Sequence, residues 1–522
     1  MKQLIFTLLF LPLQLVAQEK DWHHLDPEDD GILGISTVKA YDYLKDKKAD
    51  TVIIAIIDNG AQITHEDLAG TIWVNPKEIP NNKIDDDNNG YIDDINGWNF
   101  LGNSKGENLK RETVGITRLY ALLHEKYVDQ TQFSIQAENL EEYKRYQFIK
   151  SEFEATLKKK NEEIIYYQNI LAYYIECDAT ISDFLKKSDY TEDEVRQIKK
   201  RNHKIASAKH FLIQIYDNKL TKKGIETRIT NLKKDLETRL NPKYKNREHI
   251  VGDDPDNMLD TLYGNNNVQA KGPYHGTGVA SVVGALNNTI GVDGVAKHVK
   301  LMIIRIVPNG DERDKDTVLA WKYAINNGAD IINCSFGKKH SVHPEFVRQA
   351  IIEAEQAGVL IVNGAGNLGT NNDEIPYYPT GLKTDSVKAN NFITVGASKS
   401  KDNEHLAAFF SNYGETSVDI FAPGFNIGNC VLNNGYDKGS GTSISAPVVA
   451  GMAAVLKSYY PYLTAKQLKE IIIKSAYIPK TERVISPGEN RKDIVSFKTL
   501  SVAGGIANLY RAVLLVEKEY KP

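Results

Sequence analysis

Apolar, β-branched runs recur along the chain, and each is bounded by Gly, Asp or Asn. Within each run the apolar residues are continuous and do not alternate with polar ones, which is typical of strands buried on both faces. Helical patterns lie between the runs, at residues 316–327 and 344–356. The runs span residues 51–58, 299–307, 329–335, 358–363 and 391–397. This alternation predicts an α/β fold of three layers, α/β/α, with a mostly parallel sheet between helices.

Residues 105–246 have a different pattern. They carry charges of both signs, are rich in Tyr and Lys, and contain few Gly or Pro. Residues 138–177 indicate one long helix, a capping box at 191–194 opens another through about residue 215, and 221–240 indicate a third. We expect a helical insertion, either an antiparallel hairpin or a small bundle. It would be a solvated spacer or stabilising element, or else a module that docks a protein partner or substrate.

The first residues have the pattern of a secretory signal peptide. Lys2 precedes an apolar run at 4–16, and the small residue Ala17 precedes a polar segment. We therefore expect cleavage after Ala17 and a mature protein that is secreted, periplasmic or at the cell surface; a buried N-terminal helix is the alternative. The run is short for a membrane span and no second one follows, so no span is expected in the mature chain. The expected parts are a signal peptide at 1–17, a first domain part at 18–104, the insertion at 105–246 and a second domain part at 247–516.

Composition adds little beyond a globular class. The chain has 522 residues, of which 41% are hydrophobic and 25% charged, and its net charge is −4. Such a charge gives no indication of a nucleic-acid partner. The three cysteines, Cys177, Cys334 and Cys430, are too few and too widely spaced for a disulfide framework. Buried free thiols are the default expectation, and one bridge is the alternative.

Three short motifs supply an acid, a base and a nucleophile. Asp58 ends an apolar strand in Ile-Ile-Asp-Asn-Gly, His275 opens His-Gly-Thr-Gly-Val-Ala, and Ser443 lies in Gly-Thr-Ser-Ile-Ser-Ala-Pro. The order Asp, His, Ser is that of subtilisin and differs from the orders in chymotrypsin and the α/β-hydrolases. The chain therefore resembles the subtilisin-like serine proteases, or subtilases, over about residues 30–100 and 250–515. That resemblance also implies the three-layer fold.

The resemblance implies a role for each of these residues. Ser443 would attack the peptide carbonyl, His275 would transfer the proton, and Asp58 would orient the imidazole. The amide of Ser443 and the side chain of Asn367 would form the oxyanion hole. Two segments would bind substrate: Ser335, Phe336 and Gly337 would pair with it as an added strand, and Gly364, Ala365 and Gly366 would line the other side of the S1 pocket.

Two positions depart from the family pattern. Asn59 stands where Ser or Thr is usual, which leaves the hydrogen bonding of Asp58 open. Gly278 stands where His is usual, and we expect looser packing there. A His at the start of a helix feels the positive end of the helix dipole, so we also expect a neutral His275.

Other residues of the same types compete for these roles. His65 is the alternative base, but it matches a family segment in which the His is not catalytic. Ser440 and Ser445 are the alternative hydroxyls, and the motif favours Ser443.

An acidic loop precedes the insertion and has the spacing of an EF-hand calcium loop. Asn96 takes the place of the usual bidentate Glu, and Asp94 is a candidate to compensate for it. The alternative is a surface turn, which Asp and Asn also favour. The candidate calcium ligands are Asp85, Asp87, Asn89, Tyr91, Asp93 and Asn96.

Together these features predict a secreted serine endopeptidase that acts on protein or peptide substrates through an acyl-enzyme. Structural calcium is expected and an organic cofactor is not. One alternative is a catalytically silent subtilase-fold protein that binds partners through the insertion. A serine esterase is the other, although a strand-like substrate segment favours an extended peptide.

Overall fold

The computed structural model describes residues 21–199, 202–269, 272, 275–384, 386–488 and 493–521. The predicted signal peptide lies outside these residues. The chain divides into two compact units. The first comprises Met1–Asn108, Ile250–Val307 and Glu312–Pro522, and the second comprises Leu109–His249 and Pro308–Asp311.

The first unit is built on a seven-stranded sheet in which every neighbouring pair is parallel. The strand order is β2-β3-β1-β4-β5-β6-β7. The five predicted runs form the five central strands, which confirms the expected sheet. The short edge strands β2 and β7 lie outside those runs. The strands are β1 (Val52–Asp58), β2 (Gly97–Asn99), β3 (Val299–Arg305), β4 (Ile331–Cys334), β5 (Leu360–Gly364), β6 (Phe392–Ser398) and β7 (Ile420–Pro423).

The central strands are buried on both faces, as their continuous apolar runs predict. In β1, Ile54 and Ile56 belong to the hydrophobic core on one side of the sheet. Ala55 and Ile57 belong to the core on the other side. Successive side chains of a strand point to opposite faces, so one run of apolar residues serves both cores.

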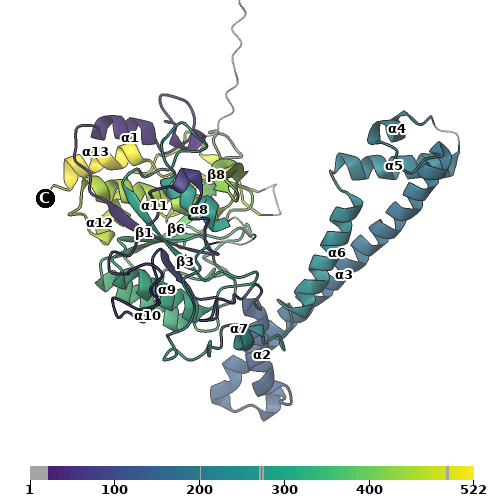
Figure 1. Ribbon diagram of the computed structural model, residues 1–522, viewed down its shortest axis with the longest axis horizontal. Coiled ribbons are helices and arrows are strands. Elements are labelled where there is room, and N and C mark those ends of the chain that lie inside the picture. Colours follow the sequence, from purple (N-terminus) through teal and green to yellow (C-terminus); the bar gives the residue numbers. More distant parts are fainter. Residues whose placement is uncertain are drawn as a thin grey trace, which may run out of the picture. The chain divides into compact units, whose positions relative to one another are not determined.

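Helices cover both faces and complete the three layers (Figure 1). On one side α8 (His275–Gly284), α11 (Thr442–Tyr459) and α12 (Ala465–Lys474) pack on the strands. On the other side α9 (Asp314–Asn326) and α10 (Pro344–Gln356) pack on β3 and β5 and on each other. The terminal helices α1 (Thr37–Leu44) and α13 (Leu509–Glu519) pack together, and α13 also contacts α11 and α12.

Two antiparallel hairpins accompany the sheet. The first, β8 (Ile427–Val431) with β9 (Gly435–Gly439), lies against α8. The second pairs β10 (Arg483–Ile485) with β11 (Ile494–Ser496). Within the described residues no helix is long and apolar enough to cross a membrane.

The second unit is helical. The 46-residue α3 (Leu140–Leu185) packs against α2 (Gly115–Tyr127), α5 (His203–Asp217) and α6 (Lys222–Glu237). The middle of α3 pairs with α6 through Glu163 and Arg228, and its end packs on α5 through Cys177 and Leu212. The chain therefore returns antiparallel along α3. A short helix, α7 (Asn246–Ile250), follows.

The continuous helix expected from residue 191 to about 215 is wrong. The capping box at Thr191 does open α4 (Glu192–Gln197), but that helix ends there. A second helix, α5, then begins after Asn202, whose side chain accepts a hydrogen bond from the N–H of Ile205. An Asn side chain that caps a helix in this way separates two helices instead of continuing one.

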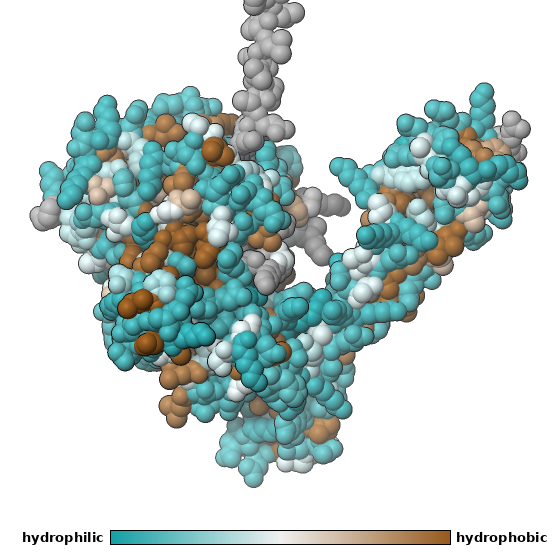
Figure 2. Space-filling view, viewed as in Figure 1, coloured by the Kyte–Doolittle hydropathy of each residue, from teal (hydrophilic) through white to brown (hydrophobic). Residues whose placement is uncertain are grey.

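The surface of α3 exposes several large apolar side chains, and hydrophobic residues follow this helix in Figure 2. Phe148, Ile165 and Tyr166 are all more than half exposed.

The cysteines are buried free thiols, as expected from the sequence. Cys177, Cys334 and Cys430 are all buried, and none forms a disulfide.

The central sheet gives a direct stability prediction. Leu301, in the middle of β3, is fully buried, and Leu301→Ala should lower the free energy of unfolding by about 2–5 kcal/mol because the truncation leaves a cavity. Urea unfolding followed by circular dichroism measures this loss. The exposed Val38 is the control, and Val38→Ala should change the stability by less than about 0.5 kcal/mol. Equal effects of the two substitutions would contradict the packing described here.

Candidate active site

Asp58 and His275 meet where β1 ends and α8 begins. Asp58 is the last residue of β1, and His275 is the first residue of α8. The Nδ1 atom of His275 lies 2.9 Å from each carboxylate oxygen of Asp58. The Asp58 side chain is only 2% exposed, whereas that of His275 is 41% exposed. The pair therefore combines a buried acceptor with an imidazole that solvent reaches.

Gly276 allows this close approach of helix and strand. A Cβ atom at Gly276 would lie 2.2 Å from the carbonyl oxygen of Gly60 and 3.1 Å from Cβ of Asp58. No larger residue fits there without moving α8 away from β1. The glycine after the histidine thus sets the distance between the imidazole and the carboxylate.

Asn59 reinforces the same junction. Its side-chain Oδ1 accepts a hydrogen bond from the N–H of Gly276 at 3.1 Å, and its own N–H donates to Oδ1 of Asp58 at 2.7 Å. The departure from Ser or Thr therefore keeps a polar contact between the end of β1 and the first turn of α8.

The electrostatics of His275 differ from the prediction based on the helix dipole. The neighbouring Asp58 carboxylate raises the pKa of His275 above its ordinary value of 6.5, against the opposing effect of burial. A full charge in hydrogen-bond contact acts more strongly than the partial charge at the end of a helix. The helix terminus therefore does not decide the protonation state of this imidazole.

Gly278 does not leave the loose packing expected from the sequence. A Cβ atom there would lie 2.9 Å from Oδ1 of Asn429, so this buried side chain of β8 already fills the space. The hairpin is also tied to α8 by a hydrogen bond from the N–H of Cys430 to Oγ of Ser281. The glycine and Asn429 therefore form one complementary contact between segments far apart in the sequence.

Ser443 lies in the first turn of α11, where backbone N–H groups have no acceptor within the helix. The end of β4 holds its backbone, because Oγ of Ser335 donates to the carbonyl of Ser443 at 2.8 Å. Asn333 in turn donates to Oγ of Ser335 at 3.0 Å. The hydroxyl of Ser335 thus fixes the backbone position of Ser443 through its carbonyl.

Asn367 is oriented by the residue before Ser443. Its Oδ1 accepts from the N–H of Thr442 at 2.8 Å and from the Thr442 hydroxyl at 3.2 Å, so its Nδ2 group faces away from these donors. A Cβ atom on Gly441 would lie 2.9 Å from Oγ of Ser443 and 3.5 Å from Nδ2 of Asn367. The hydroxyl and the amide donor therefore border the same small space beside Gly441.

The competing residues have structural contacts. Ser445 is fully buried and donates to the carbonyl of Ala422, and Oγ of Ser440 accepts from the N–H of Asn426. His65 is fully buried, and its Nδ1 accepts from the N–H of Asp67.

The two predicted substrate segments follow neighbouring parallel strands. Ser335, Phe336 and Gly337 come directly after β4, and Gly364 ends β5 before Ala365 and Gly366. Phe336 and Ala365 are buried in apolar cores, so these segments offer mainly backbone at the sheet edge.

Sequence reasoning missed Tyr377, which lies between these two segments. Its hydroxyl donates to the carbonyl of Gly337 at 2.8 Å. Its residue type gave no signal, because an isolated Tyr in a loop matches no motif.

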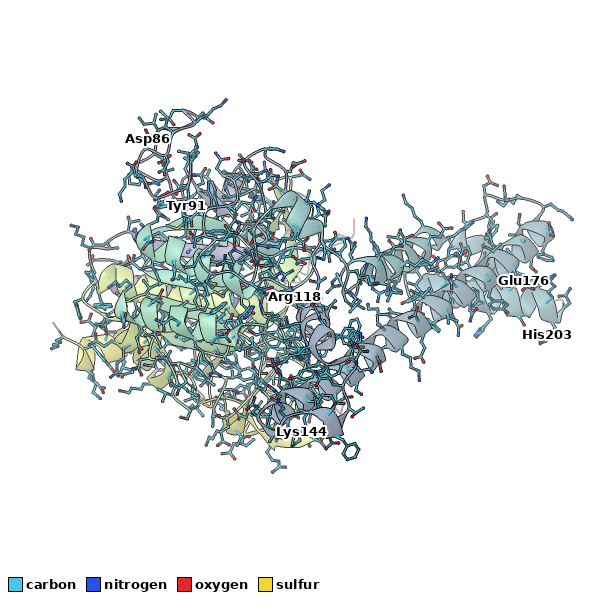
Figure 3. All side chains as sticks on the ribbon, turned by 90° about the horizontal axis from the view of Figure 1, so that it is seen from below. Asp86, Tyr91, Arg118, Lys144, Glu176 and His203 are labelled. Carbon is cyan, nitrogen blue, oxygen red and sulfur yellow. The ribbon has the colours of Figure 1, made fainter. Side chains whose placement is uncertain are left out.

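The acidic loop groups its carboxylates differently from the predicted EF-hand arrangement. In Figure 3, Asp86 lies at the outer end of this loop and Tyr91 lies closer to the body of the unit. The side chains of Asp85, Asn89 and Asp93 accept hydrogen bonds from backbone N–H groups of the loop. The Tyr91 ring packs on Trp98, Phe100 and Tyr323, and Asn96 donates to the carbonyl of Trp73. Short Asp and Asn side chains satisfy nearby backbone in this way in many turns.

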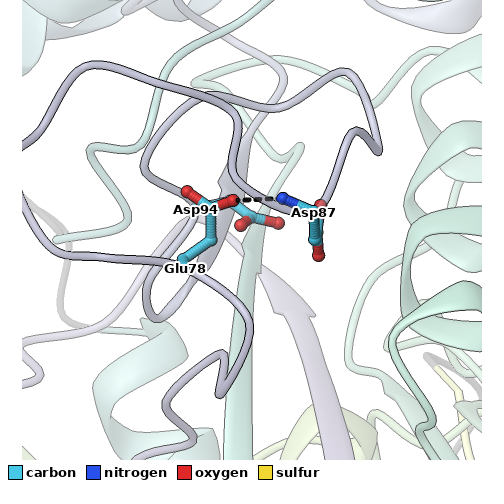
Figure 4. A group of neighbouring side chains, drawn as sticks. All are labelled: Glu78, Asp87 and Asp94. Carbon is cyan, nitrogen blue, oxygen red and sulfur yellow. Dashed lines mark hydrogen bonds between the residues drawn. The ribbon is translucent and has the colours of Figure 1, made fainter.

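Only Asp87 of the six predicted ligands belongs to the carboxylate cluster that the structure forms. It joins Glu78 and Asp94, with ligand atoms all within 4.8 Å of one another (Figure 4). Asn75 donates to both Asp87 and Asp94. Glu78, which sequence reasoning missed, accepts the N–H groups of Asp86 and Asp87. A set of oxygen donors alone has the chemistry that Ca²⁺ or Mg²⁺ prefers and lacks the N and S ligands typical of Zn²⁺.

Burial in this cluster raises the pKa of Asp94 to about 6, although Tyr323, Asn75 and Asn89 donate hydrogen bonds to it. Three neighbouring carboxylates are costly to keep charged without a cation, because like charges in one site repel each other.

The Asp58–His275 contact predicts a titration. Since Asp58 raises the pKa of His275, its imidazole should lose its proton above pH 6.5 in the native protein. Asp58→Asn removes the charge that raises this pKa, while the burial that lowers it remains. The pKa of His275 should therefore fall below 6.5. Proton NMR of the imidazole measures both values. Asp42→Asn, at an exposed position of α1, is the control and should leave the titration unchanged; an unchanged pKa in Asp58→Asn would contradict the contact.

Comparisons with known proteins identify the family of the chain. The model of the subtilase family, Peptidase_S8, matches residues 49–501. A thermostable alkaline protease of Halalkalibacterium halodurans is 36% identical over 203 residues, 39% of this chain and 52% of that protein. Subtilisin DY of Bacillus licheniformis is 35% identical over 207 residues, 39% of this chain and 71% of its own.

Among solved structures, the prenylagaramide maturation protease PagA aligns with a TM-score of 0.37 and 25% identity, over 46% of this chain and 81% of its own. The matched region spans about half the length of the H. halodurans relative. Because the family model matches most of the chain, this protein belongs to the subtilase family.

Proposed function

We propose that the protein is a serine endopeptidase whose catalytic residues are Asp58, His275 and Ser443. The observation that carries this proposal is the contact of His275 Nδ1 with both oxygens of the buried Asp58 carboxylate. That contact leaves Nε2 as the ring nitrogen for proton transfer. Its raised pKa also suits an imidazole that must accept a proton near neutral pH.

The reaction would proceed through an acyl-enzyme. Oγ of Ser443 attacks the scissile carbonyl carbon while its proton passes to His275. The tetrahedral intermediate then collapses, the C–N bond breaks, and His275 returns the proton to the leaving amine. Water, deprotonated by His275, then attacks the ester carbonyl; the bond between the acyl carbon and Oγ of Ser443 breaks, the acid product leaves, and His275 returns the proton to Oγ. Asp58 keeps its charge throughout and stabilises the imidazolium.

Two donors would hold the oxyanion. Asn367 is oriented by Thr442, so its Nδ2 group needs no rearrangement when negative charge develops. The N–H of Ser443 in the first turn of α11 would be the second donor. Donors that are already oriented stabilise the transition state without a cost of reorganisation.

The substrate would bind in an extended form. The backbone after β4 at Ser335–Gly337 would pair with the peptide, and the backbone at Gly364–Gly366 would flank the residue before the scissile bond. Pairing of an extended peptide with an exposed sheet segment provides main-chain hydrogen bonds whatever the sequence of the peptide. This favours a peptidase over an esterase.

We propose that the cluster of Glu78, Asp87 and Asp94 holds a structural calcium ion, with Asn75 beside it. The oxygen-only donor set supports this proposal. A bound Ca²⁺ would neutralise the crowded carboxylates and stiffen the loop, and it would take no part in the chemistry.

We also propose export of the protein through the N-terminal segment at residues 1–17, and a protein partner at the second, helical unit. The apolar residues exposed on α3 support the partner.

The oxyanion hole gives a kinetic test of the proposed function. Asn367→Ala should lower kcat about 10²–10³-fold with little change in KM, the loss measured for one such donor in a subtilase. Hydrolysis of a peptide amide with a fluorogenic leaving group measures both constants. Asn390→Ala, at an exposed asparagine outside the site, is the control and should leave both kcat and KM unchanged. A wild type without turnover would favour the catalytically silent binding protein, and an unchanged kcat in Asn367→Ala would contradict this oxyanion hole.

Calcium should raise the melting temperature, and the rise should grow with the logarithm of the free Ca²⁺ concentration above the Kd. At a free concentration about 100 times the Kd, binding adds about 2.7 kcal/mol to stability. Calorimetry with added Ca²⁺ and then with chelator measures the shift. Asp94→Asn and Glu78→Gln should each abolish it, and Asp437→Asn, an exposed carboxylate on β9, should keep it. A shift that survives loss of both carboxylates would place the ion elsewhere.

A further inference from the structure

Tyr377 occupies the space between the two predicted substrate segments. A Cβ atom on Gly337 would lie 2.4 Å from Cε1 of Tyr377. A Cβ atom on Gly366 would lie 3.0 Å from both Cδ1 and Cε1 of the same ring. The ring edge is therefore in contact with a glycine of each segment and fills the space between them. In the proposed binding mode, the side chain before the scissile bond would enter this cleft.

Hydrogen bonds of the Tyr377 hydroxyl and of the neighbouring backbone hold the ring in this position. Its hydroxyl donates to the carbonyl of Gly337 at 2.8 Å. The adjacent residue, Tyr378, forms a two-way backbone bridge with Lys338, with N···O distances of 2.9 and 2.8 Å. A rotation of the ring out of the cleft would break the hydroxyl bond, and a shift of its backbone would break the bridge.

From this geometry we propose that Tyr377 is the residue that determines specificity at the S1 pocket and that it restricts the residue before the scissile bond to Gly, Ala or Ser. This inference rests on the proposed peptidase function. A side chain no larger than a methyl or hydroxymethyl group fits beside the ring, whereas Leu or Phe would collide with it. Steric exclusion of this kind acts against larger substrates and leaves small ones bound.

A cavity of about 410 Å³ lies beside the ring and shows what its removal would do. Tyr377 lines this cavity together with Gly364 and Ala365, and Asp373 and Thr394 also border it. Truncation of the ring would join the cleft to this space. Tyr377→Ala should therefore accept Leu and Phe.

The test uses a series of peptide amides that differ only in the residue before the scissile bond. The wild type should cleave the Ala peptide at least about 10-fold faster, in kcat/KM, than the Phe peptide, since a pocket discriminates by about 10- to 200-fold for small changes in side-chain size. Tyr377→Ala should shift the Phe/Ala ratio of kcat/KM by at least about 10-fold towards Phe. Tyr377→Phe keeps the ring and should hold the ratio within about threefold, because the barrier is steric.

The proposal would be overturned by a wild type that prefers Phe or Leu, or by a ratio in Tyr377→Ala that equals the wild-type ratio. A ratio in Tyr377→Phe that shifts as much as in Tyr377→Ala would also contradict the ring as the barrier. Tyr462→Ala, at an exposed tyrosine outside the cleft, is the matched control and should keep the wild-type ratio.

A binding measurement separates this inference from the proposed function. In the Ser443→Ala background, fluorescence anisotropy of labelled product peptides that end in Ala or Phe reports the pocket without catalysis. The Ala peptide should bind at least about 10-fold tighter, and Tyr377→Ala should remove that preference. Equal binding of the two peptides to the Ser443→Ala protein that retains Tyr377 would overturn the inference, even if the wild-type enzyme is active. The expected preference in a protein without turnover would uphold the inference and reject the proposed function.

Discussion

The close approach of α8 to the end of β1 is the constraint on which the rest of the site depends. Gly276 leaves room for the carbonyl of Gly60, and Asn59 joins both elements by hydrogen bonds, so His275 can reach both oxygens of Asp58. The same edge of the parallel sheet brings β4 and β5 to the start of α11, where Ser335 and Thr442 hold Ser443 and Asn367. Ligand and catalytic groups gather at this edge in open α/β sheets because consecutive parallel strands all end there.

Much of this arrangement could be predicted from the sequence, because its signals are local. Continuous apolar runs predicted the five central strands, and the glycine-flanked motifs singled out Asp58, His275 and Ser443. The rest could not be predicted, because it depends on contacts between distant segments. Asn429 fills the space beside Gly278, Tyr377 lies between Gly337 and Gly366, and Glu78 joins Asp87 and Asp94. The break between α4 and α5 depended on one capping residue, Asn202, within an otherwise helical pattern.

The two units of the chain contribute differently to the features described above. The predicted motifs all lie in the first unit, while the family model matches residues 49–501 and so spans both units. The second unit interrupts that domain with the long helix α3 and its antiparallel partners. Tyr377 lies in a loop of the first unit, and in our proposal it narrows the cleft without altering the strands on either side. Differences in substrate range within one fold can therefore arise from a single loop side chain.

Asp58, His275 and Ser443 are proposed to act as one assembly, and covalent labelling with a fluorophosphonate would show whether they do. Peptide mass mapping would locate the label in the wild type and in His275→Ala. We expect a label on Ser443 in the wild type, and its loss in His275→Ala because the hydroxyl is no longer activated. A folded wild type that does not react, or a label on another serine such as Ser440, would contradict it.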